Sequence, residues 1–381
     1  MANDRRALIA MSGGVDSSVC ALLMRAAGYT CKGATMRLYR NADIGLSQYH
    51  GCHTQRDIDD AADVAFTLDM PFHILDYTAE FRQAVIEKFI STYEAGGTSN
   101  PCIDCNRSLK FGALLSYAAE HGFDCAATGH YARIQYDAAS GRYLLRRALD
   151  ASKDQSYVLY MLTQAQLARL RFPLGDHTKA QAREMAAAAG LCNARKHDSQ
   201  DICFVPDDDY AAFMERSRGL TYPAGNFVDL SGAVVGRHRG AVRYTIGQRR
   251  GLGLALGAPV YVCARRMADN TVVVGPERAL YARALLADEV NWIPFDAPTE
   301  PLRVMACTRY RHAPQPATAR ITEDGLLYLE FDAPQRAITP GQAVVRLSEN
   351  DHRYPRNHRE YRERKRVRSF RTCERRLGRR R

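Results

Sequence analysis

The chain has 381 residues, of which 46% are hydrophobic and 25% charged, a composition typical of soluble globular proteins with two or three domains. No apolar run reaches the roughly 18 to 20 residues that a membrane span needs, and the first residues lead into a strand pattern rather than a signal peptide. These features argue against membrane and secreted proteins. We therefore expect a cytoplasmic protein without a membrane partner.

The net charge of +11 comes almost entirely from the C-terminal end. Residues 346–381 contain 15 Lys and Arg against 5 Asp and Glu, a balance of +10 that leaves +1 for the rest of the chain. Such a basic run is typical of a solvated, disordered tail, although it is also able to contact RNA phosphates. Charge alone therefore does not establish a nucleic-acid partner.

The first strong pattern lies at residues 8–18, where an apolar strand leads into two glycines, a carboxylate and three serines. Residues 19–27 show helical spacing closed by Gly28, so the glycines fall at a strand-to-helix turn. Glycine backbone can direct successive N–H groups at one anion, and the following helix adds its positive dipole end. This segment predicts a phosphate site, and Asp16 within it indicates a bridging magnesium ion. A capped glycine turn without a ligand is the alternative.

Strand and helix patterns alternate as far as residue 130. Residues 30–36, 72–75 and 125–130 show strand patterns, with helical spacing between them and over residues 109–121. This alternation predicts a parallel sheet with helices on both faces. Ligands of such sheets bind beyond the carboxyl ends of the strands, where Met36 and Gly129 lie with the glycine turn. A hairpin over residues 131–148 and helices at 164–169 and 179–189 follow.

Three folded regions and a tail are expected. We place the first domain at residues 1–208. A glycine-dense region of short strands at 209–282 predicts a small β-rich central domain, and strand patterns at 283–348 predict a C-terminal β-barrel. Because the composition changes abruptly at the tail, residues 349–381, we expect a disordered tail and a barrel without its last strand.

Only two of the eleven cysteines, Cys102 and Cys105, form a close pair. In a reducing compartment a C-x-x-C pair is more typical of redox or metal chemistry than of a structural disulfide. The sequence predicts a helix from about Arg107, and a thiol at its N-terminus near Arg107 and Lys110 would have a lowered pKa. Cys203 follows an acidic, polar run; taken alone, it is also compatible with a small buried apolar residue.

Taken together, the motifs resemble the tRNA-specific 2-thiouridylases, a family of pyrophosphate-loop (PP-loop) ATPases. The resemblance covers about residues 7 to 345. Its motifs occur in the family's order and comprise Ser12 to Ser18, Asn100-Pro101 with Cys105-Asn106, Thr128 to Tyr131, Lys153 to Gln155, Asp198 to Phe204 and Tyr244 to Leu252. It implies an α/β fold in which a parallel-sheet domain of the adenine-nucleotide alpha-hydrolase type precedes the central domain and the barrel.

The resemblance implies ATP-dependent 2-thiolation of the wobble uridine in tRNA. In the family, ATP adenylates the C2 oxygen of the uracil, and a persulfide sulfur, obtained from a donor protein, displaces AMP. Residue by residue, Cys203 matches the cysteine that holds the persulfide, and Cys105 matches the nucleophile that helps release its sulfur. A disulfide between these two cysteines remains to be reduced.

The resemblance also assigns two sets of binding residues. The set for ATP with Mg²⁺ comprises Ala10, Met11, Ser12, Gly13, Gly14, Val15, Asp16, Ser17, Met36 and Gly129. The set for tRNA comprises Asn100, Pro101, Cys102, His130, Lys153, Asp154, Gln155, Arg309, Tyr310 and Gln342.

One position departs from the family pattern. Cys102 stands where many members have Asp, so the acid or base role of that carboxylate cannot be transferred, and Asp104 is not an obvious substitute. If Cys102, Cys105 and Cys203 met at one site, their thiolates would suit an iron-sulfur cluster with an open iron. Two other functions stay open, namely another PP-loop ATP pyrophosphatase or ligase and a non-catalytic RNA-binding protein.

Overall fold

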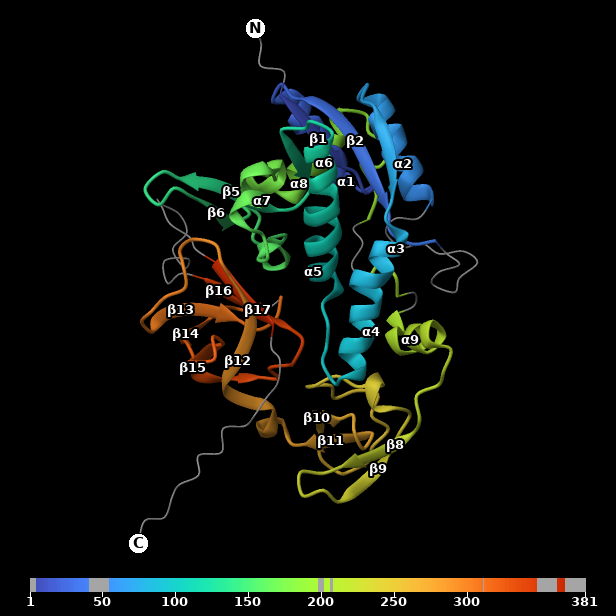
Figure 1. Ribbon diagram of the computed structural model, residues 1–381. Helices are drawn as coiled ribbons and strands as arrows, with labels where there is room; N and C mark the ends of the chain where they lie inside the picture. The colour runs from blue at the N-terminus through green and yellow to red at the C-terminus, as the bar shows by residue number, and fades with distance from the viewer. Residues whose placement is uncertain are drawn as a thin grey trace.

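The computed structural model describes residues 5–40, 55–197, 202–205, 208–310, 312–347 and 362–366. Figure 1 shows an α/β domain at one end, a small β-sheet at the opposite end and a β-barrel beside them. Two helical segments, α4 (Glu87–Glu94) and α5 (Pro101–Cys105), lie between these parts. The predicted order of a parallel-sheet domain, a β-rich central domain and a barrel is confirmed.

The N-terminal domain is built on a five-stranded parallel sheet with the strand order β3-β2-β1-β4-β7. Its strands are β1 (Arg6–Ala10), β2 (Thr30–Arg37), β3 (Phe72–Asp76), β4 (Cys125–Thr128) and β7 (Leu170–Arg171). Successive side chains of a strand point to opposite faces. Accordingly, Leu8 belongs to one apolar core, while Ala7 and Ile9 belong to the other. The sheet is therefore covered on both faces, as predicted.

Two groups of helices supply these cores. The face of Ala7 and Ile9 packs against α1 (Val15–Ala26), α2 (Gln55–Thr67) and α8 (Lys179–Ala188). The face of Leu8 packs against α3 (Thr78–Phe81), the π-helix η2 (Arg82–Ile86), α4, α5, the π-helix η3 (Asn106–Ala113), α6 (Leu114–Glu120) and α7 (Gln164–Arg169). A hairpin of β5 (Ala132–Asp137) and β6 (Arg142–Arg147) follows β4, and the short 3-10 helices η4 (Ser156–Leu159) and η5 (Pro173–Asp176) complete the domain.

Two predicted helix starts differ from the structure. Helix α1 begins at Val15, directly after Gly14, rather than at residue 19. The helix expected from about Arg107 already begins at Pro101, because Pro is pre-organised for the first helical position, and α5, η3 and α6 continue one another. Cys102 therefore lies in the first helical turn, whereas Cys105 lies inside the continuous helical segment.

The central domain follows helix α9 (Tyr210–Arg218). Its four strands run in the order β10-β11-β8-β9, with β8 (Gly225–Val228), β9 (Val234–His238), β10 (Tyr261–Arg266) and β11 (Thr271–Gly275). The 3-10 helix η7 (Ala241–Arg243) lies between β9 and β10, and η8 (Glu277–Leu280) follows β11. A separate small apolar core around Phe227 and Val272 stabilises the domain.

The barrel closes through a strand from the basic tail. Its order is β12-β15-β14-β13-β16-β17, formed by β12 (Tyr281–Trp292), β13 (Leu302–Cys307), β14 (Gln315–Ile321), β15 (Leu327–Arg336), β16 (Ala343–Leu347) and β17 (Arg362–Arg366). Strand β17 pairs with both β16 and β12. The expectation of a barrel without its last strand, and of disorder throughout 349–381, is therefore wrong for Arg362–Arg366. Backbone pairing satisfies the edges of β12 and β16 without any apolar pattern.

Among the helices of the described part of the chain, none combines the length and the apolar character needed to cross a membrane.

Candidate active site

Two glycines allow the loop after β1 to form. Gly13 has φ +72°, and a Cβ atom there would lie 2.1 Å from the carbonyl oxygen of Asp57. A Cβ atom at Gly129, which follows β4, would lie 2.7 Å from the backbone N of Ser17. Backbone atoms cannot withdraw as a flexible side chain does, so only glycine fits at these two positions. The loop and the end of β4 are thus packed directly against each other.

The serine hydroxyls hold the shape of this loop. Ser17 and Ser18 donate to the carbonyl oxygen of Gly14, at 2.9 and 3.0 Å. The Ser12 backbone N–H donates to the hydroxyl oxygen of Ser17 at 3.1 Å. Both Ser17 and Ser18 are buried. These two hydroxyls bond back to the Gly14 carbonyl and do not cap the helix, so the backbone N–H groups of the first turn of α1 remain available to an anion.

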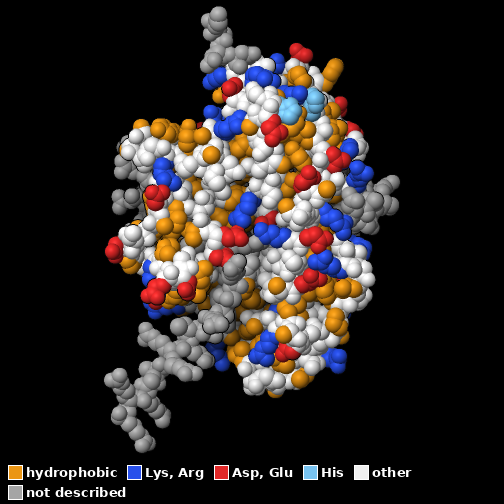
Figure 2. All heavy atoms as spheres, in the orientation of Figure 1, with side chains coloured by type: hydrophobic (Ala, Val, Ile, Leu, Met, Phe, Trp, Pro, Cys, Tyr) orange, Lys and Arg blue, Asp and Glu red, His pale blue; other side chains and the backbone are white. Residues whose placement is uncertain are grey.

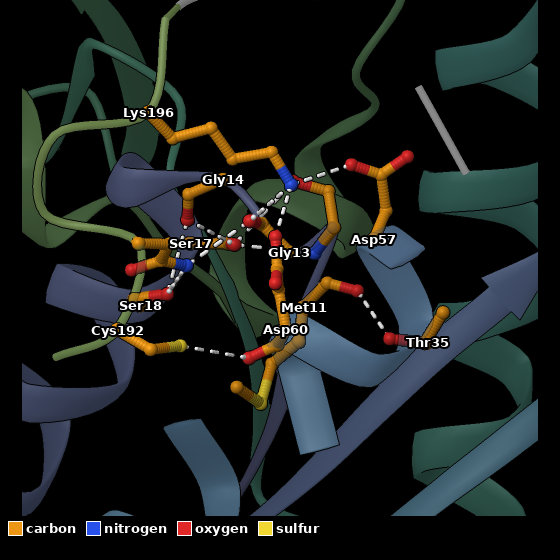
Figure 3. A network of polar contacts seen from close by, with 12 residues as sticks. Met11, Gly13, Gly14, Ser17, Ser18, Thr35, Asp57, Asp60, Cys192 and Lys196 are labelled. Atoms are coloured by element: carbon orange, nitrogen blue, oxygen red, sulfur yellow. Dashed lines mark hydrogen bonds and ion pairs between the residues drawn. The ribbon is translucent and has the colours of Figure 1, made fainter. Parts of the chain in front are cut away.

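Lys196, which lies late in the sequence of the domain, contacts the loop at Gly13 (Figure 3). Lys196 donates to the carbonyl oxygen of Gly13 at 3.1 Å and pairs with the carboxylates of Asp57, at 2.7 Å, and Asp60. Burial alone would lower the pKa of Lys196, but hydrogen bonds and attraction from the two carboxylates outweigh it and raise that pKa. Asn193 also donates to the Gly13 carbonyl, at 3.0 Å. The loop is held in place before any ligand arrives.

A second lysine neutralises the carboxylate of the loop. Lys179, the first residue of α8, donates to both carboxylate oxygens of Asp16, at 2.7 and 2.9 Å. The hydroxyl of Tyr131 donates to one of these oxygens at 2.9 Å. Both oxygens thus already accept hydrogen bonds, and the described residues contain no cluster of three or more His, Cys, Asp or Glu able to hold a metal. The chain itself does not form a ready magnesium site at Asp16.

A pocket opens between the loop and the carboxyl ends of β2 and β4. Its cavity volume is about 170 Å³, and it is lined by Ala10, Met11, Ser12, Asp16, Ser17, Ala34, Met36, Lys110, Thr128, Gly129, His130 and Gln155. Seven residues of the predicted ATP set lie on its wall, while Gly13 and Gly14 belong to the same loop and Val15 begins α1. Two residues of the predicted tRNA set, His130 and Gln155, also line it.

His130 is a neutral group within this wall. Burial lowers its pKa well below the ordinary value, and the nearby Lys110 ammonium lowers that pKa further. Its Nδ1 lies 2.7 Å from the hydroxyl oxygen of Thr128, and its ring packs at 5.5 Å from Phe111 and 5.9 Å from Phe172. At neutral pH this imidazole is therefore a polar, uncharged surface for a ligand.

The buried imidazole makes stability depend on pH. An unfolded histidine has a pKa of about 6.5, so below that pH the unfolded state binds a proton that folded His130 refuses. We expect the free energy of unfolding to fall with pH below about 6.5, by up to about 1.4 kcal/mol per pH unit for this residue. Denaturant titrations at several pH values between 5 and 8 give the free energy of unfolding at each pH. This free energy should depend less steeply on pH in His130→Gln than in wild type. The exposed His73→Gln serves as control, and equal slopes in all three proteins would contradict the expectation.

The two predicted reactive cysteines contact the same apolar core. Cys105 is buried in that core, and Cys203 is half-buried and packs against it. Next to Cys203, the ring of Phe204 lies among aromatic rings that include Phe81, at 5.6 Å. The hydroxyl of Tyr39, just beyond β2, donates to the carbonyl oxygen of Cys203. The acidic run at 198–201 lies outside the described residues.

The surroundings of the C-x-x-C pair bear on three expectations from the sequence. Arg107 pairs with Glu289 of the barrel at 2.8 Å, so its guanidinium also makes a contact between domains. Asp104 is buried and pairs with Lys88 at 2.8 Å, which agrees with its not replacing the missing carboxylate at Cys102. Cys102 is exposed. Because the described residues contain no metal-binding cluster, the structure does not support the iron-sulfur alternative at Cys102, Cys105 and Cys203.

The remaining residues of the predicted tRNA set lie where the domains meet. Asn100 and Pro101 begin α5 beside Cys102. The Tyr310 hydroxyl donates to the carbonyl oxygen of Asp154 at 3.2 Å, and Lys153 and Gln155 flank that residue. In this structure the side chains of Arg309 and Gln342 make hydrogen bonds within the protein. Arg309 donates to the carbonyls of Ile246 and Ala337 and to the Thr339 hydroxyl. Gln342 donates to the Thr98 carbonyl. Contact of this set with tRNA stays a prediction.

Sequence reasoning missed Lys179, Lys196 and Asn193. The predicted helix start at residue 179 is confirmed, and Thr178 and Gln181 form a capping box there, but nothing local connects Lys179 to Asp16. The partners are 163 residues apart in the chain. Lys110 was considered only as a neighbour of the cysteines, whereas it lines the phosphate-loop pocket.

A parallel sheet with a glycine-rich anion loop after its first strand, and a pocket at the carboxyl ends of its strands, defines a PP-loop nucleotide-binding protein. Three family models match successive parts of the chain. They are described as a tRNA methyl transferase HUP domain at residues 5–207, a tRNA methyl transferase PRC-barrel domain at 212–276 and an aminomethyltransferase beta-barrel domain at 282–351.

Full-length relatives specify the family further. The chain is 48% identical to the tRNA-specific 2-thiouridylase MnmA of Heliobacterium modesticaldum, over 89% of this chain and 88% of the relative. It is 48% identical to that of Moorella thermoacetica, over 89% and 95%, and 44% identical to that of Lachnoclostridium phytofermentans, over 90% and 96%. The chain belongs to the family of tRNA-specific 2-thiouridylases MnmA. The methyl transfer in the domain descriptions is not the activity that these relatives are named for.

Proposed function

We propose that this protein uses ATP to replace the C2 oxygen of the wobble uridine of tRNA with sulfur. One observation carries the proposal beyond family membership. Lys110, on the wall of the phosphate-loop pocket, and Cys105 lie five residues apart on one continuous helical segment. A nucleotide in the pocket and a nucleophilic thiol would therefore share one rigid support, as a reaction between an activated base and a sulfur carrier requires.

The first step activates the base. The uracil C2 oxygen attacks the α-phosphorus of ATP, the bond between the α-phosphorus and the bridging oxygen breaks, and pyrophosphate leaves with the electron pair. The loop N–H groups after β1 and the dipole of α1 bind the phosphates that become pyrophosphate. We propose that Mg²⁺ enters with ATP, held mainly by the phosphates, since Mg²⁺ commonly binds substrate phosphates with few protein ligands.

The second step transfers sulfur. The terminal sulfur of a Cys203 persulfide attacks C2, and AMP leaves with the former carbonyl oxygen. The Cys105 thiolate then attacks Sγ of Cys203, so that the sulfur–sulfur bond breaks and its electron pair stays on the sulfur now bound to C2. A Cys105–Cys203 disulfide remains, and an external dithiol reduces it by becoming a disulfide itself. A donor protein supplies the sulfane sulfur, and we place the reaction in the cytoplasm.

The proposal is tested by measuring 2-thiouridine in unmodified tRNA after incubation with the protein, ATP and a persulfide donor. Digestion to nucleosides and mass spectrometry detect the product. We expect 2-thiouridine only when ATP is present, with one AMP released per modified base. Product formation without ATP, or tRNA binding without any product, would contradict the proposal. The second outcome would favour the non-catalytic RNA-binding alternative.

Lys110 is expected to bind the phosphates of ATP. Lys179 and Lys196 pair with carboxylates, whereas Lys110 has no ion pair with any residue that the structure describes. Removing a charge-assisted hydrogen bond costs about 1.5 to 3 kcal/mol, so Lys110→Met should raise the Kd for ATP about 10- to 100-fold. Calorimetric titration measures the change, and Lys110→Arg should retain most of the affinity. An unchanged Kd in Lys110→Met would remove this residue from the ATP site.

A further inference from the structure

All three domains meet at residues 96–99, which join α4 to α5 and which we call the strap. From the central domain, Nη2 of Arg265 on β10 donates to the carbonyl oxygens of Gly96 and Gly97, at 2.8 and 2.6 Å. The same nitrogen lies 3.3 Å from the hydroxyl oxygen of Thr98. Figure 1 shows the connection between α4 and α5 reaching the central-domain sheet. The guanidinium of Arg265 thus makes hydrogen bonds to three consecutive residues of the strap.

The barrel holds the strap from its other side. The side-chain amide of Gln342 donates to the carbonyl oxygen of Thr98 at 2.9 Å, and the Thr98 N–H donates to the carbonyl oxygen of Pro340 at 2.8 Å. Gly341 has φ +84°, and a Cβ atom there would lie 3.0 Å from both the N and the O of Thr98. The loop that leads into β16 and the strap are therefore in backbone contact.

Burying the guanidinium of Arg265 at this contact costs stability. Its Nε and Nη1 atoms are buried without a hydrogen-bond partner among the residues that the structure describes, and burial lowers its pKa. Its charge faces the ring of Tyr93 at 5.6 Å rather than a carboxylate of the described chain. A buried guanidinium without an acid costs stability that an apolar side chain would not cost. Such a cost suits a residue that fixes a position rather than one that only strengthens packing.

The strap leads directly into the reactive helix. Asn100 occupies the N-cap position of α5, and the next five residues include Cys102 and Cys105. We propose that Arg265 and Gln342 are positioning residues, which fix the strap and thereby the place of Cys105 relative to the ATP pocket and to tRNA held at the domain junction. The catalytic part of this inference rests on the proposed function. The placement of Cys105 does not, and it can be measured without substrate.

The first test measures how fast iodoacetamide alkylates Cys105 in the absence of ATP and tRNA, read by peptide mass spectrometry. Because Arg265→Ala removes several hydrogen bonds to the strap, we expect the rate to rise about tenfold. Gln342→Leu removes one such bond and should raise the rate about two- to fivefold. Arg265→Lys should fall between wild type and Arg265→Ala, since a lysine keeps the charge without the planar fork.

The second test compares thiolation with ATP binding in the same proteins. Misplacement of a reacting group by about 1 Å can cost about 10²-fold in rate, so kcat for thiolation should fall by about this factor in Arg265→Ala. The Kd for ATP should stay within about twofold of wild type, because no strap residue lines the pocket. At a temperature well below Tm, a loss of stability alone would not lower kcat for thiolation while leaving the Kd for ATP unchanged.

Arg218→Ala is the matched control. Arg218 ties α9 to the same helix α4 through Glu87 and Glu94, at 2.6 and 3.2 Å, but makes no hydrogen bond or ion pair with the strap in the described structure. It should lower Tm and leave Cys105 alkylation unchanged. Wild-type alkylation in both Arg265→Lys and Gln342→Leu would overturn the inference, even if Arg265→Ala fails to fold. If wild type makes no 2-thiouridine, the proposed function fails, while the alkylation rates still decide the role of the strap.

Discussion

Cys203→Ala should abolish 2-thiouridine formation while ATP binding persists. Cys203 lies outside the phosphate-loop pocket, so the Kd for ATP should change by less than about twofold. Without its thiol no persulfide forms, and product formation should fall by at least about 10³-fold, as when a covalent nucleophile is removed from an enzyme. The measurements are nucleoside mass spectrometry for the product and calorimetry for ATP.

A companion variant separates the two thiols. Cys105→Ala should still accept a persulfide on Cys203, which raises the intact mass by about 32 Da, the mass of one sulfur atom. The variant should nevertheless form little 2-thiouridine. Cys263→Ala, in strand β10 of the central domain, is the control and should behave as wild type. If both Cys203→Ala and Cys105→Ala thiolate tRNA as fast as wild type, the persulfide mechanism is wrong.

Gly129→Ala should weaken ATP binding by crowding the phosphate loop. The added methyl group would lie 2.6 Å from the carbonyl carbon of Asp16 and 2.7 Å from the N of Ser17. The loop has to move away from β4, and overpacking of this kind costs about 1 to 3 kcal/mol, which corresponds to about a 5- to 150-fold rise in the Kd for ATP. Isothermal titration calorimetry provides the measurement.

Gly141→Ala is the control for this substitution. Gly141 lies in the turn between β5 and β6 at φ +68°, where an added Cβ meets no atom within 4 Å. It should reduce stability by about 1 to 2 kcal/mol through backbone strain and leave ATP binding unchanged. ATP binding by Gly129→Ala with wild-type affinity would mean that the loop tolerates displacement and that the contact between Gly129 and the loop is not required.

The sequence was sufficient for the parts of the fold that depend on local patterns. Apolar runs and turn residues predicted the parallel sheet, the glycine-dense central domain and the barrel, and the phosphate loop was found from Gly13 and its neighbours. The start of α5 was missed because the helix was placed from about Arg107, although Pro101 suits the first helical position. Strand β17 was missed because its charged residues carry no alternating apolar pattern.

The polar support of the site could not be predicted in the same way. Lys179 and Lys196 reach Asp16 and Asp57 from positions more than a hundred residues away. Pairing over such separations depends on how α8 and the following segment pack on the sheet, and a single sequence does not specify which of many lysines meets which carboxylate. The roles of Arg265 and Gln342 at the strap are of the same kind, since each joins one domain to another.

The anchoring of Cys203 bears on how sulfur reaches the active site. The adjacent Phe204 is buried among aromatic rings, and Tyr39 holds the carbonyl of Cys203 itself. A cysteine fixed in this way cannot travel between a donor and the nucleotide as a swinging arm does. Under the proposed function, the donor would instead have to bring its persulfide to a stationary thiol. The loading of Cys203 should therefore saturate with donor concentration, with a rate set by the encounter of two proteins and not by a slow rearrangement of this one.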